Sequence, residues 1–234
     1  MQLFSVNVAH PREVSYRGRT YLTAIFKQPV AGGVAVRRLN IDGDSQGNPR
    51  THGGPDMAVY VFGHEHYAQW EREFGRQLPF GSFGENLTVT GMDEAEVAVG
   101  DVFRIGGARL QVTEPRTPCH KLAMKFDDDD LPRRFAATGH VGFYCRVLTE
   151  GDIVAGDAIV LEVRDPARLT VAEVLALWAD KGATTARLAR ALDVAALSAT
   201  WRARFEARLK SLAAAASATD DDRLEWSHER LTWV

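Results

Sequence analysis

One short segment, residues 113–121, places a cysteine among three basic side chains. The sulfur belongs to Cys119, and its basic neighbours are Arg116, His120 and Lys121. Two prolines before the sulfur stiffen the segment, because proline fixes φ and offers no backbone N–H. Nearby cations lower the pKa of a thiol and favour the thiolate, the form that attacks electrophiles and binds metals. The segment therefore predicts a sulfur presented to a metal or a substrate, with a buried thiol in a tight turn as the alternative.

The second cysteine has the setting of a core residue. Cys145 alternates with Phe143 and Val147 on one face of a predicted strand. A cysteine on a buried apolar face behaves as a small hydrophobic side chain. The first residues lack a secretory pattern, and no apolar run approaches the ~20 residues that span a bilayer. We therefore expect a cytoplasmic protein without membrane association, whose two cysteines stay reduced.

Two further polar segments offer binding groups. His52, Gly53, Gly54 and Asp56 form a loop whose glycines let the backbone approach a bound group and whose N–H groups can face an anion. Taken alone, the segment is better explained as a loop in which aspartate and histidine only satisfy backbone groups. Asn86 follows a glycine at the start of a predicted strand, where its amide either bonds a heterocycle or supports an unusual backbone conformation.

Composition and missing motifs exclude several classes of protein. The chain has 234 residues, with 28 Lys plus Arg and 31 Asp plus Glu, a net charge of −3. A general nucleic-acid binder is usually strongly basic, so we expect no nucleic-acid partner. Walker, dinucleotide-binding and serine-hydrolase motifs are absent, and no second cysteine stands at zinc spacing. His64 and His66 are two residues apart on a predicted helix and therefore point in different directions.

The first 165 residues read as many short strands separated by turns. Strands are expected at residues 3–8, 20–26, 34–39, 58–62, 87–89, 102–105, 109–112, 142–147 and 158–163. Glycine pairs at 32–33 and 106–107 predict hairpin turns. Helices are expected at 65–74 and 131–138. Many short strands with frequent turns indicate a mainly β fold, a barrel or a sandwich.

After residue 165 the pattern changes to helices. Thr170 and Glu173 form a capping-box pattern, and apolar residues then recur at helical spacing. Two more helices are expected near 185–192 and from Ser198 onward. A helix-turn-helix for DNA is one alternative, but the segment lacks a strongly basic face, so a packing or dimer module is favoured. Residues 213–217 either extend the third helix or form a linker, and Asp220–Asp222 is expected to be a solvated turn.

Six motifs together resemble the MOSC superfamily, and within it the YiiM type. They are TAIFKQPV at 23–30, the strand at 34–39, DGDSQ at 42–46, HGGPD at 52–56, FGENL at 83–87 and PRTPCHKL at 115–122. The resemblance implies a barrel-like, mainly β domain over residues 1–165, a three-helix domain over 166–214 and a tail over 215–234. Two positions depart from the family pattern, because Met57 stands where a lysine is common and Asn48 where an acidic residue is common.

The resemblance also implies a cofactor and a set of site residues. In related proteins the loop cysteine ligates the molybdenum of the molybdenum cofactor (molybdopterin), which assigns Cys119 here as the metal ligand, and a soft thiolate suits such a centre. Lys27 and Arg38 are expected to bind the pterin's phosphate. The full set of expected cofactor-binding residues is Lys27, Arg38, His52, Gly53, Gly54, Asp56, Asn86, Arg116, Thr117 and Lys121. Pyridoxal phosphate binding is a further property that the superfamily resemblance carries.

The activity that the resemblance implies is an oxidoreductase reaction. The expected substrate is a small N-hydroxylated compound such as 6-hydroxylaminopurine, with electrons supplied by a separate reductase because no flavin or nicotinamide motif is visible. His52 or His120 is the expected proton donor, since imidazole titrates near neutrality. The alternatives are a non-catalytic carrier of the cofactor or of sulfur on Cys119, and a thiol hydrolase. A homodimer is the expected assembly.

Overall fold

The computed structural model describes residues 1–47 and 53–228, with side chains through residue 214. His52, Asn48 and the last six residues therefore lie outside the described part. The strands within it are β1 (Gln2–Val8), β2 (Arg12–Tyr16), β3 (Arg19–Thr23), β4 (Gln28–Pro29), β5 (Val34–Val36), β6 (Val59–Gly63), β7 (Leu87–Thr90), β8 (Val102–Ile105), β9 (Ala108–Pro115), β10 (Phe143–Thr149), β11 (Gly151–Ile153) and β12 (Ile159–Val163). The helices are the 3₁₀ turns η1 (Pro55–Met57) and η2 (His64–His66), then α2 (Tyr67–Phe74), α3 (His120–Phe126), α4 (Leu131–Ala137), α5 (Val171–Ala179), α6 (Thr185–Leu192) and α7 (Ala199–His228).

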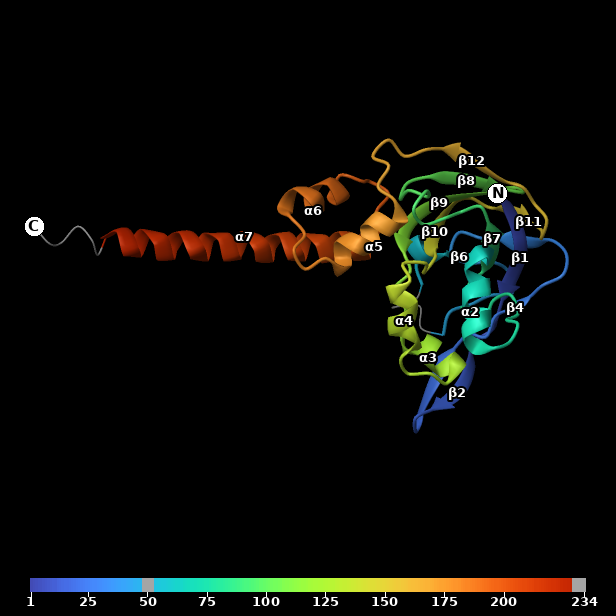
Figure 1. Ribbon diagram of the computed structural model, residues 1–234. Coiled ribbons are helices and arrows are strands. Elements are labelled where there is room, and N and C mark those ends of the chain that lie inside the picture. The colour runs from blue at the N-terminus through green and yellow to red at the C-terminus, as the bar shows by residue number, and fades with distance from the viewer. Residues whose placement is uncertain (48–52, 229–234) are drawn as a thin grey trace, which may run out of the picture.

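Among the described residues, eight strands form one mixed sheet that curls on itself. Their order is β12-β8-β9-β10-β6-β7-β1-β4, and only β6 and β7 run parallel. An isolated bridge between Gln2 and Ala158, with hydrogen bonds from Leu3 N to Asp157 O and from Ile159 N to Met1 O, joins β1 to the start of β12. The sheet thereby closes into the curved body seen in Figure 1. The predicted mainly β, barrel-like class with an added helical module is confirmed.

An aromatic cluster fastens the helices to the sheet. Phe62 of β6 and Phe83 pack with Trp70 of α2 and Phe135 of α4, with ring centroids 4.9–6.0 Å apart. Each of these side chains is buried. Because aromatic side chains bury large areas and contribute about 0.5–1.5 kcal/mol per pair beyond that burial, the cluster holds α2 and α4 against one face of the barrel.

One of the two predicted glycine hairpins forms. Gly106 and Gly107 connect β8 to β9, and Gly106 takes the positive φ of 51° that such a turn needs. The prediction at Gly32 and Gly33 is wrong, because the flanking strands pair elsewhere. β4 pairs with β1, and β5 pairs with β11, which lies more than a hundred residues along the chain.

The helical module follows the predicted pattern and then exceeds it. Thr170 makes the predicted capping box with Glu173, and the Ser198 hydroxyl accepts a hydrogen bond from Trp201 N. α7 continues through residues 213–217 to His228, so the alternative of a helix extension is confirmed and the predicted acidic turn at 220–222 is wrong. Figure 1 shows α7 extending away from the barrel. No helix in the described part of the chain combines the length and apolar character needed to span a membrane.

Candidate functional site

A cleft lies where the end of β3, the 44–47 segment, β6 and the segment that follows β9 meet. Its open space, including the part open to solvent, is about 640 Å³. The described residues that line it are Thr23, Ala24, Ile25, Lys27, Asp44, Ser45, Gln46, Gly47, Met57, Tyr60, Gly84, Asn86, Arg116, Thr117, Cys119, Lys121 and Tyr144. Four of the six motifs that define the family resemblance contribute at least two residues to this wall.

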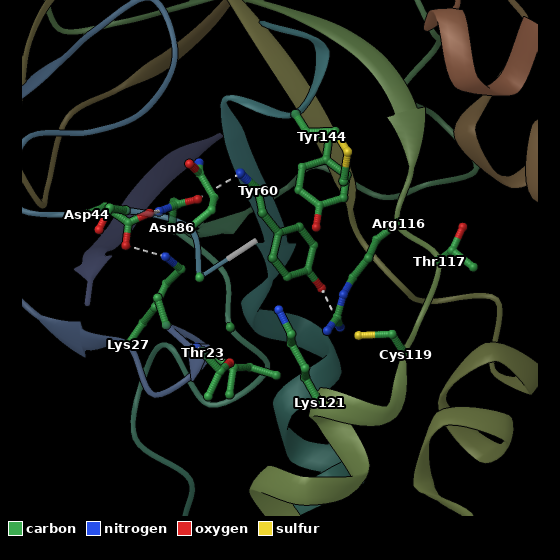
Figure 2. A pocket seen from close by; sticks show the side chains of 17 residues that line it. Thr23, Lys27, Asp44, Tyr60, Asn86, Arg116, Thr117, Cys119, Lys121 and Tyr144 are labelled. Atoms are coloured by element: carbon green, nitrogen blue, oxygen red, sulfur yellow. Dashed lines mark hydrogen bonds and ion pairs between the residues drawn. The ribbon is translucent and has the colours of Figure 1, made fainter. Parts of the chain in front are cut away.

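The sulfur of Cys119 stands at the wall of this cleft. Cys119 is half-buried, has extended backbone dihedrals and immediately precedes α3. Figure 2 shows its sulfur, the guanidinium of Arg116 and the ammonium of Lys121 directed toward the same space. Cys119 interacts electrostatically with Arg116, Lys121 and Tyr144. The rigid segment after β9 therefore presents a thiol beside two cations, as the sequence predicted.

Arg116 is a buried cation held by aromatic rings. Its Nη1 donates to the Tyr60 hydroxyl at 3.2 Å, and its guanidinium lies 4.8 Å from the Tyr60 ring centroid and 5.3 Å from that of Phe135. Burial acts to lower the pKa of Arg116, but Tyr60, Tyr144 and Cys119 raise it above its ordinary value. The side chain therefore stays charged at the base of the cleft and is fixed in orientation by cation–π contacts.

Tyr60 and Tyr144 form the aromatic side of the cleft. They stand opposite each other in the pairing of β6 with β10, and their ring centroids are 5.2 Å apart. The Tyr60 hydroxyl donates to Val141 O at 2.8 Å. Burial raises the pKa of Tyr144 to about 12, although Arg116 acts to lower it. Burial raises the pKa of Tyr60 as well, so both hydroxyls are protonated at neutral pH.

Lys27, Asp44 and Asn86 form a buried network on the other side. Lys27 and Asp44 make an ion pair, and Asp44 also accepts hydrogen bonds from Asn86 Nδ2 and Ala9 N, each at 2.9 Å. The side-chain oxygen of Asn86, Oδ1, accepts from Tyr60 N at 3.0 Å. Burial lowers the pKa of Lys27, while Asp44 opposes that change. Asn86 thus uses its amide to tie the strands around the cleft together, and Lys27 is already partnered.

The described lining of the cleft is positively charged. Lys27, Arg116 and Lys121 carry three positive charges, and Asp44 is the only carboxylate among the described residues that line it. Lys121 is half-buried, and burial lowers its pKa although Cys119 acts to raise it. Two cations are thus left over after the Lys27–Asp44 pair. An anionic group beside a soft metal atom matches this arrangement, because cations bind phosphate and a thiolate binds soft metals.

The structure places some predicted site residues outside this cleft. Arg38 is exposed. Its backbone N–H donates to the Glu150 carboxylate, and its Nη1 donates to Leu148 O. His120 is exposed and its ring packs on Tyr21, 5.0 Å between centroids. Partial burial and then Lys121 lower the pKa of His120. Neither Arg38 nor His120 is among the described residues that line the cleft.

The HGGPD segment connects the barrel to the helical module. Asp56 pairs with Arg146 Nη2 at 2.7 Å and accepts from the Ala199 N–H at the start of α7. Gly54 has a φ of 96° and introduces η1, whose last residue, Met57, lines the cleft. The described residues of this segment are thus neighbours of the cleft wall rather than part of it; they are Gly53, Gly54 and Asp56. His52 lies outside the described part of the chain. The Thr117 hydroxyl, which Figure 2 shows directed away from Cys119, accepts from Arg204 Nη1 at 3.4 Å.

Sequence reasoning missed the two tyrosines. Tyr60 and Tyr144 lie on predicted strands, and nothing in either strand alone distinguishes them from core residues. Only the register of β6 against β10 brings them together above Arg116. Knowledge that these two strands pair in this register would have identified the two tyrosines as neighbours.

Comparisons with known proteins agree with this fold. The model of the MOSC domain matches residues 48–160, and the model of the YiiM-like 3-alpha helix domain matches residues 169–212. The chain is 40% identical to protein YflK of Bacillus subtilis over 87% of its length and 92% of that protein. It is 36% identical to protein YiiM of Escherichia coli over 80% of its length and 84% of that protein. A Gibberella moniliformis protein named Reductase is 34% identical over 67% of this chain and 28% of that protein.

Solved structures give the same result. The crystal structure of YiiM from Geobacillus stearothermophilus superposes with a TM-score of 0.76 at 37% identity, covering 89% of this chain and 98% of that one. The crystal structure of YiiM from Escherichia coli gives a TM-score of 0.70 at 31% identity, covering 90% and 94%. The chain therefore belongs to the MOSC-domain family, and within it to the YiiM type with a C-terminal three-helix domain.

Proposed function

We propose that this protein is a molybdenum-cofactor-dependent reductase of small N-hydroxylated compounds, such as 6-hydroxylaminopurine, and that it takes electrons from a separate reductase. Three facts support the proposal. MOSC domains are generally associated with molybdenum cofactor binding. One relative is named Reductase. The third fact, the chemistry of the cleft, carries the proposal.

The single observation that carries it is the position of Cys119 at the wall of a cleft with excess positive charge. A molybdenum centre held by pterin sulfurs accepts a further soft ligand, which a thiolate provides. The phosphate of the pterin needs cations, which Arg116 and Lys121 provide. The donor set therefore fits the cofactor. When bound, the cofactor supplies a two-electron centre that can accept the oxygen of an N–OH group.

The remaining task of the protein is to hold the substrate and supply protons. Reduction of R–NHOH to R–NH₂ and water consumes two electrons and two protons, and it breaks the N–O bond. Among the described residues that line the cleft, Tyr144 and Lys121 carry protons and face the space beside Cys119. Tyr144, which is partly exposed, offers an aromatic face on which a purine ring can stack, whereas Tyr60 is buried against Arg116. This assignment differs from the predicted donors, because His120 is not among the described residues that line the cleft and His52 lies outside the described part of the chain.

The test compares two cysteine variants of cofactor-loaded protein. Cys119→Ala should retain less than about 1% of the wild-type rate of 6-hydroxylaminopurine reduction in the presence of a reductase, because loss of a metal ligand removes the centre. Cys145→Ala is the matched control and should keep most of the activity, because that thiol is buried in the core. Equal activity of Cys119→Ala and wild type contradicts the proposal. A sulfur adduct on Cys119 without molybdenum, detected by mass spectrometry, supports the carrier function instead.

A further inference from the structure

A second cluster of metal-ligating side chains lies outside the cleft. It consists of His66 at the end of η2, Glu94 in the loop after β7, and His140 in the turn before β10. His66 Nε2 lies 3.0 Å from Glu94 Oε2, and His140 Nδ1 lies 3.5 Å from the same oxygen. All three potential ligand atoms are within 4.8 Å of one another. None of the three residues lines the Cys119 cleft.

We propose that His66, Glu94 and His140 bind a divalent transition-metal ion of the zinc class. Two imidazoles and one carboxylate are a common ligand set for zinc with a fourth position left to water. Bonds of about 2.0–2.1 Å in tetrahedral geometry separate ligand atoms by roughly 3.3–3.5 Å. The separations of 3.0 and 3.5 Å from Glu94 Oε2 to the two ring nitrogens are close to that spacing.

The hydrogen bonding of the cluster points to a missing ligand. His140 Nδ1 is buried and has no hydrogen-bond partner among the described residues. A buried polar atom without a partner destabilises the folded protein. Glu94 Oε2 is hydrogen-bonded to His66 at 3.0 Å, whereas His140 Nδ1, 3.5 Å from the same oxygen, makes no hydrogen bond to it. A cation between the three atoms satisfies all of them and neutralises the buried carboxylate.

The surroundings hold two of the ligands in position. Glu94 uses its other oxygen to accept the N–H of Gly142 at 2.7 Å, and such an outer contact orients a carboxylate ligand. Gly63 leaves space for the His66 ring, because a Cβ at that position would stand 3.0 Å from His66 Cδ2 and 3.1 Å from Nε2. The side chains of Glu94 and His66 are 2% and 10% exposed, so both are held by the body of the protein.

His140 is the ligand whose side chain has room to move, and it lies on the solvent-accessible side of the cluster. Its side chain is 41% exposed, so an ion reaches the cluster from this side. The rings of His66 and His140 are stacked, with centroids 4.2 Å apart and planes inclined by 18°. Two parallel rings do not aim both nitrogen lone pairs at one ion, so binding requires the His140 ring to tilt. Its partly exposed side chain has the room to do so.

The site sits directly behind the wall of the cleft. Gly142 donates its N–H to Glu94 and accepts the N–H of Arg116 through its carbonyl at 3.1 Å. A bound ion therefore braces the 140–142 segment against which Arg116 is seated. Its expected role is structural, and its presence does not depend on the function proposed for Cys119.

Zinc titration of the untagged full-length protein against a chromophoric chelator tests this site. Wild type should bind one zinc ion per chain in this cluster, and His140→Ala and Glu94→Gln should bind it at least about tenfold more weakly. His10→Ala removes an exposed histidine outside the cluster and should bind as wild type does, as should Cys119→Ala. Cobalt provides a second readout, because its visible absorption in a tetrahedral site should appear in wild type and disappear in His140→Ala. Wild-type zinc affinity in His140→Ala, or a loss of binding confined to Cys119→Ala, overturns the proposal. His140 is half-exposed, so its variant decides the question even if Glu94→Gln fails to fold.

Discussion

At the residue scale, the two cysteines show how surroundings set the role of one side chain. Cys145 lies in the core with 2% exposure, and burial raises the pKa of its thiol. Cys119 is half-buried beside Arg116 and Lys121 at the wall of a cleft. The same side chain is therefore an apolar filler at one position and an accessible sulfur at the other.

Lys121 provides a residue-scale prediction about cofactor binding. Its ammonium faces the cleft beside Cys119, and the described lining offers no carboxylate besides Asp44, which pairs with Lys27. A hydrogen bond to a charged group contributes about 1.5–3 kcal/mol, so Lys121→Gln should weaken cofactor retention by roughly ten- to a hundredfold. The measurement is molybdenum per chain after gel filtration of the loaded protein. Lys181→Gln, which removes an exposed charge from the helical module, is the control and should retain wild-type content. Equal molybdenum in the two variants would count against an anion-binding role for Lys121.

The residues of the site were predictable only where the chain itself brings them together. Arg116, Cys119 and Lys121 lie within six residues, and their clustering survives folding because two prolines and α3 hold the segment. Arg38 was chosen for its charge near Lys27 in the sequence, but it lies on a different surface with Glu150. Arg38 lies in the bend that follows β5, and neither charge nor proximity along the chain shows on which surface such a residue lies.

At the element scale, β9 and α7 meet around a buried carboxyl group. Glu114 is 4% exposed, and one of its oxygens has no hydrogen-bond partner in the described part of the chain. Burial raises the pKa of Glu114 to about 7, and Asp56 adds to this, while Ser198 and Arg204 oppose it. The carboxyl group therefore binds its proton more tightly in the folded protein than in the unfolded chain.

The sign of the resulting pH dependence follows from that comparison. The unfolded pKa is about 4.3, so the stabilisation from proton binding is fully present below that pH and is lost as the pH rises to about 7. Glu114→Gln removes this dependence. We expect the variant to exceed wild type in free energy of unfolding by on the order of 1–3 kcal/mol at pH 8, and by much less at pH 5. Urea denaturation at both pH values measures this difference. A difference that is the same at pH 5 and pH 8 would refute the assignment.

Elements with a clear local pattern were predicted, and elements without one, β2 and α3 among them, were not. The 102–105 strand and the capping box of α5 were confirmed, because alternation and capping are local properties. β4 and β11, of two and three residues, were missed because so few residues show no alternation. The hairpin predicted at Gly32–Gly33 failed for a related reason, since the partners of β4 and β5 are set by the closed barrel and not by the turn.

At the scale of the whole molecule, one ion pair links the barrel, the helical module and the cleft. Asp56 of η1 pairs with Arg146 of β10 at 2.7 Å and accepts the N–H of Ala199 at the start of α7. Arg146 also donates to Ala196 O in the segment before α7. Met57, the next residue after Asp56, lines the cleft. The helical module is thereby joined to the cleft wall.

A double-mutant cycle on this pair tests that link. Asp56→Ala and Arg146→Ala should each lower the free energy of unfolding by about 1–3 kcal/mol, because each leaves a partly buried charge without its partner. The two effects should be non-additive, with a coupling of at least about 0.5 kcal/mol. Additive effects within error would show that the pair does not join the two parts of the protein.

The central claim is that the Cys119 sulfur is bonded to molybdenum, and X-ray absorption at the molybdenum edge tests it most directly. Cofactor-loaded wild type and Cys119→Ser should be compared, with Cys145→Ala as the control. We expect one sulfur ligand fewer in Cys119→Ser than in wild type and in Cys145→Ala. The same number of sulfur ligands in all three proteins would contradict the account.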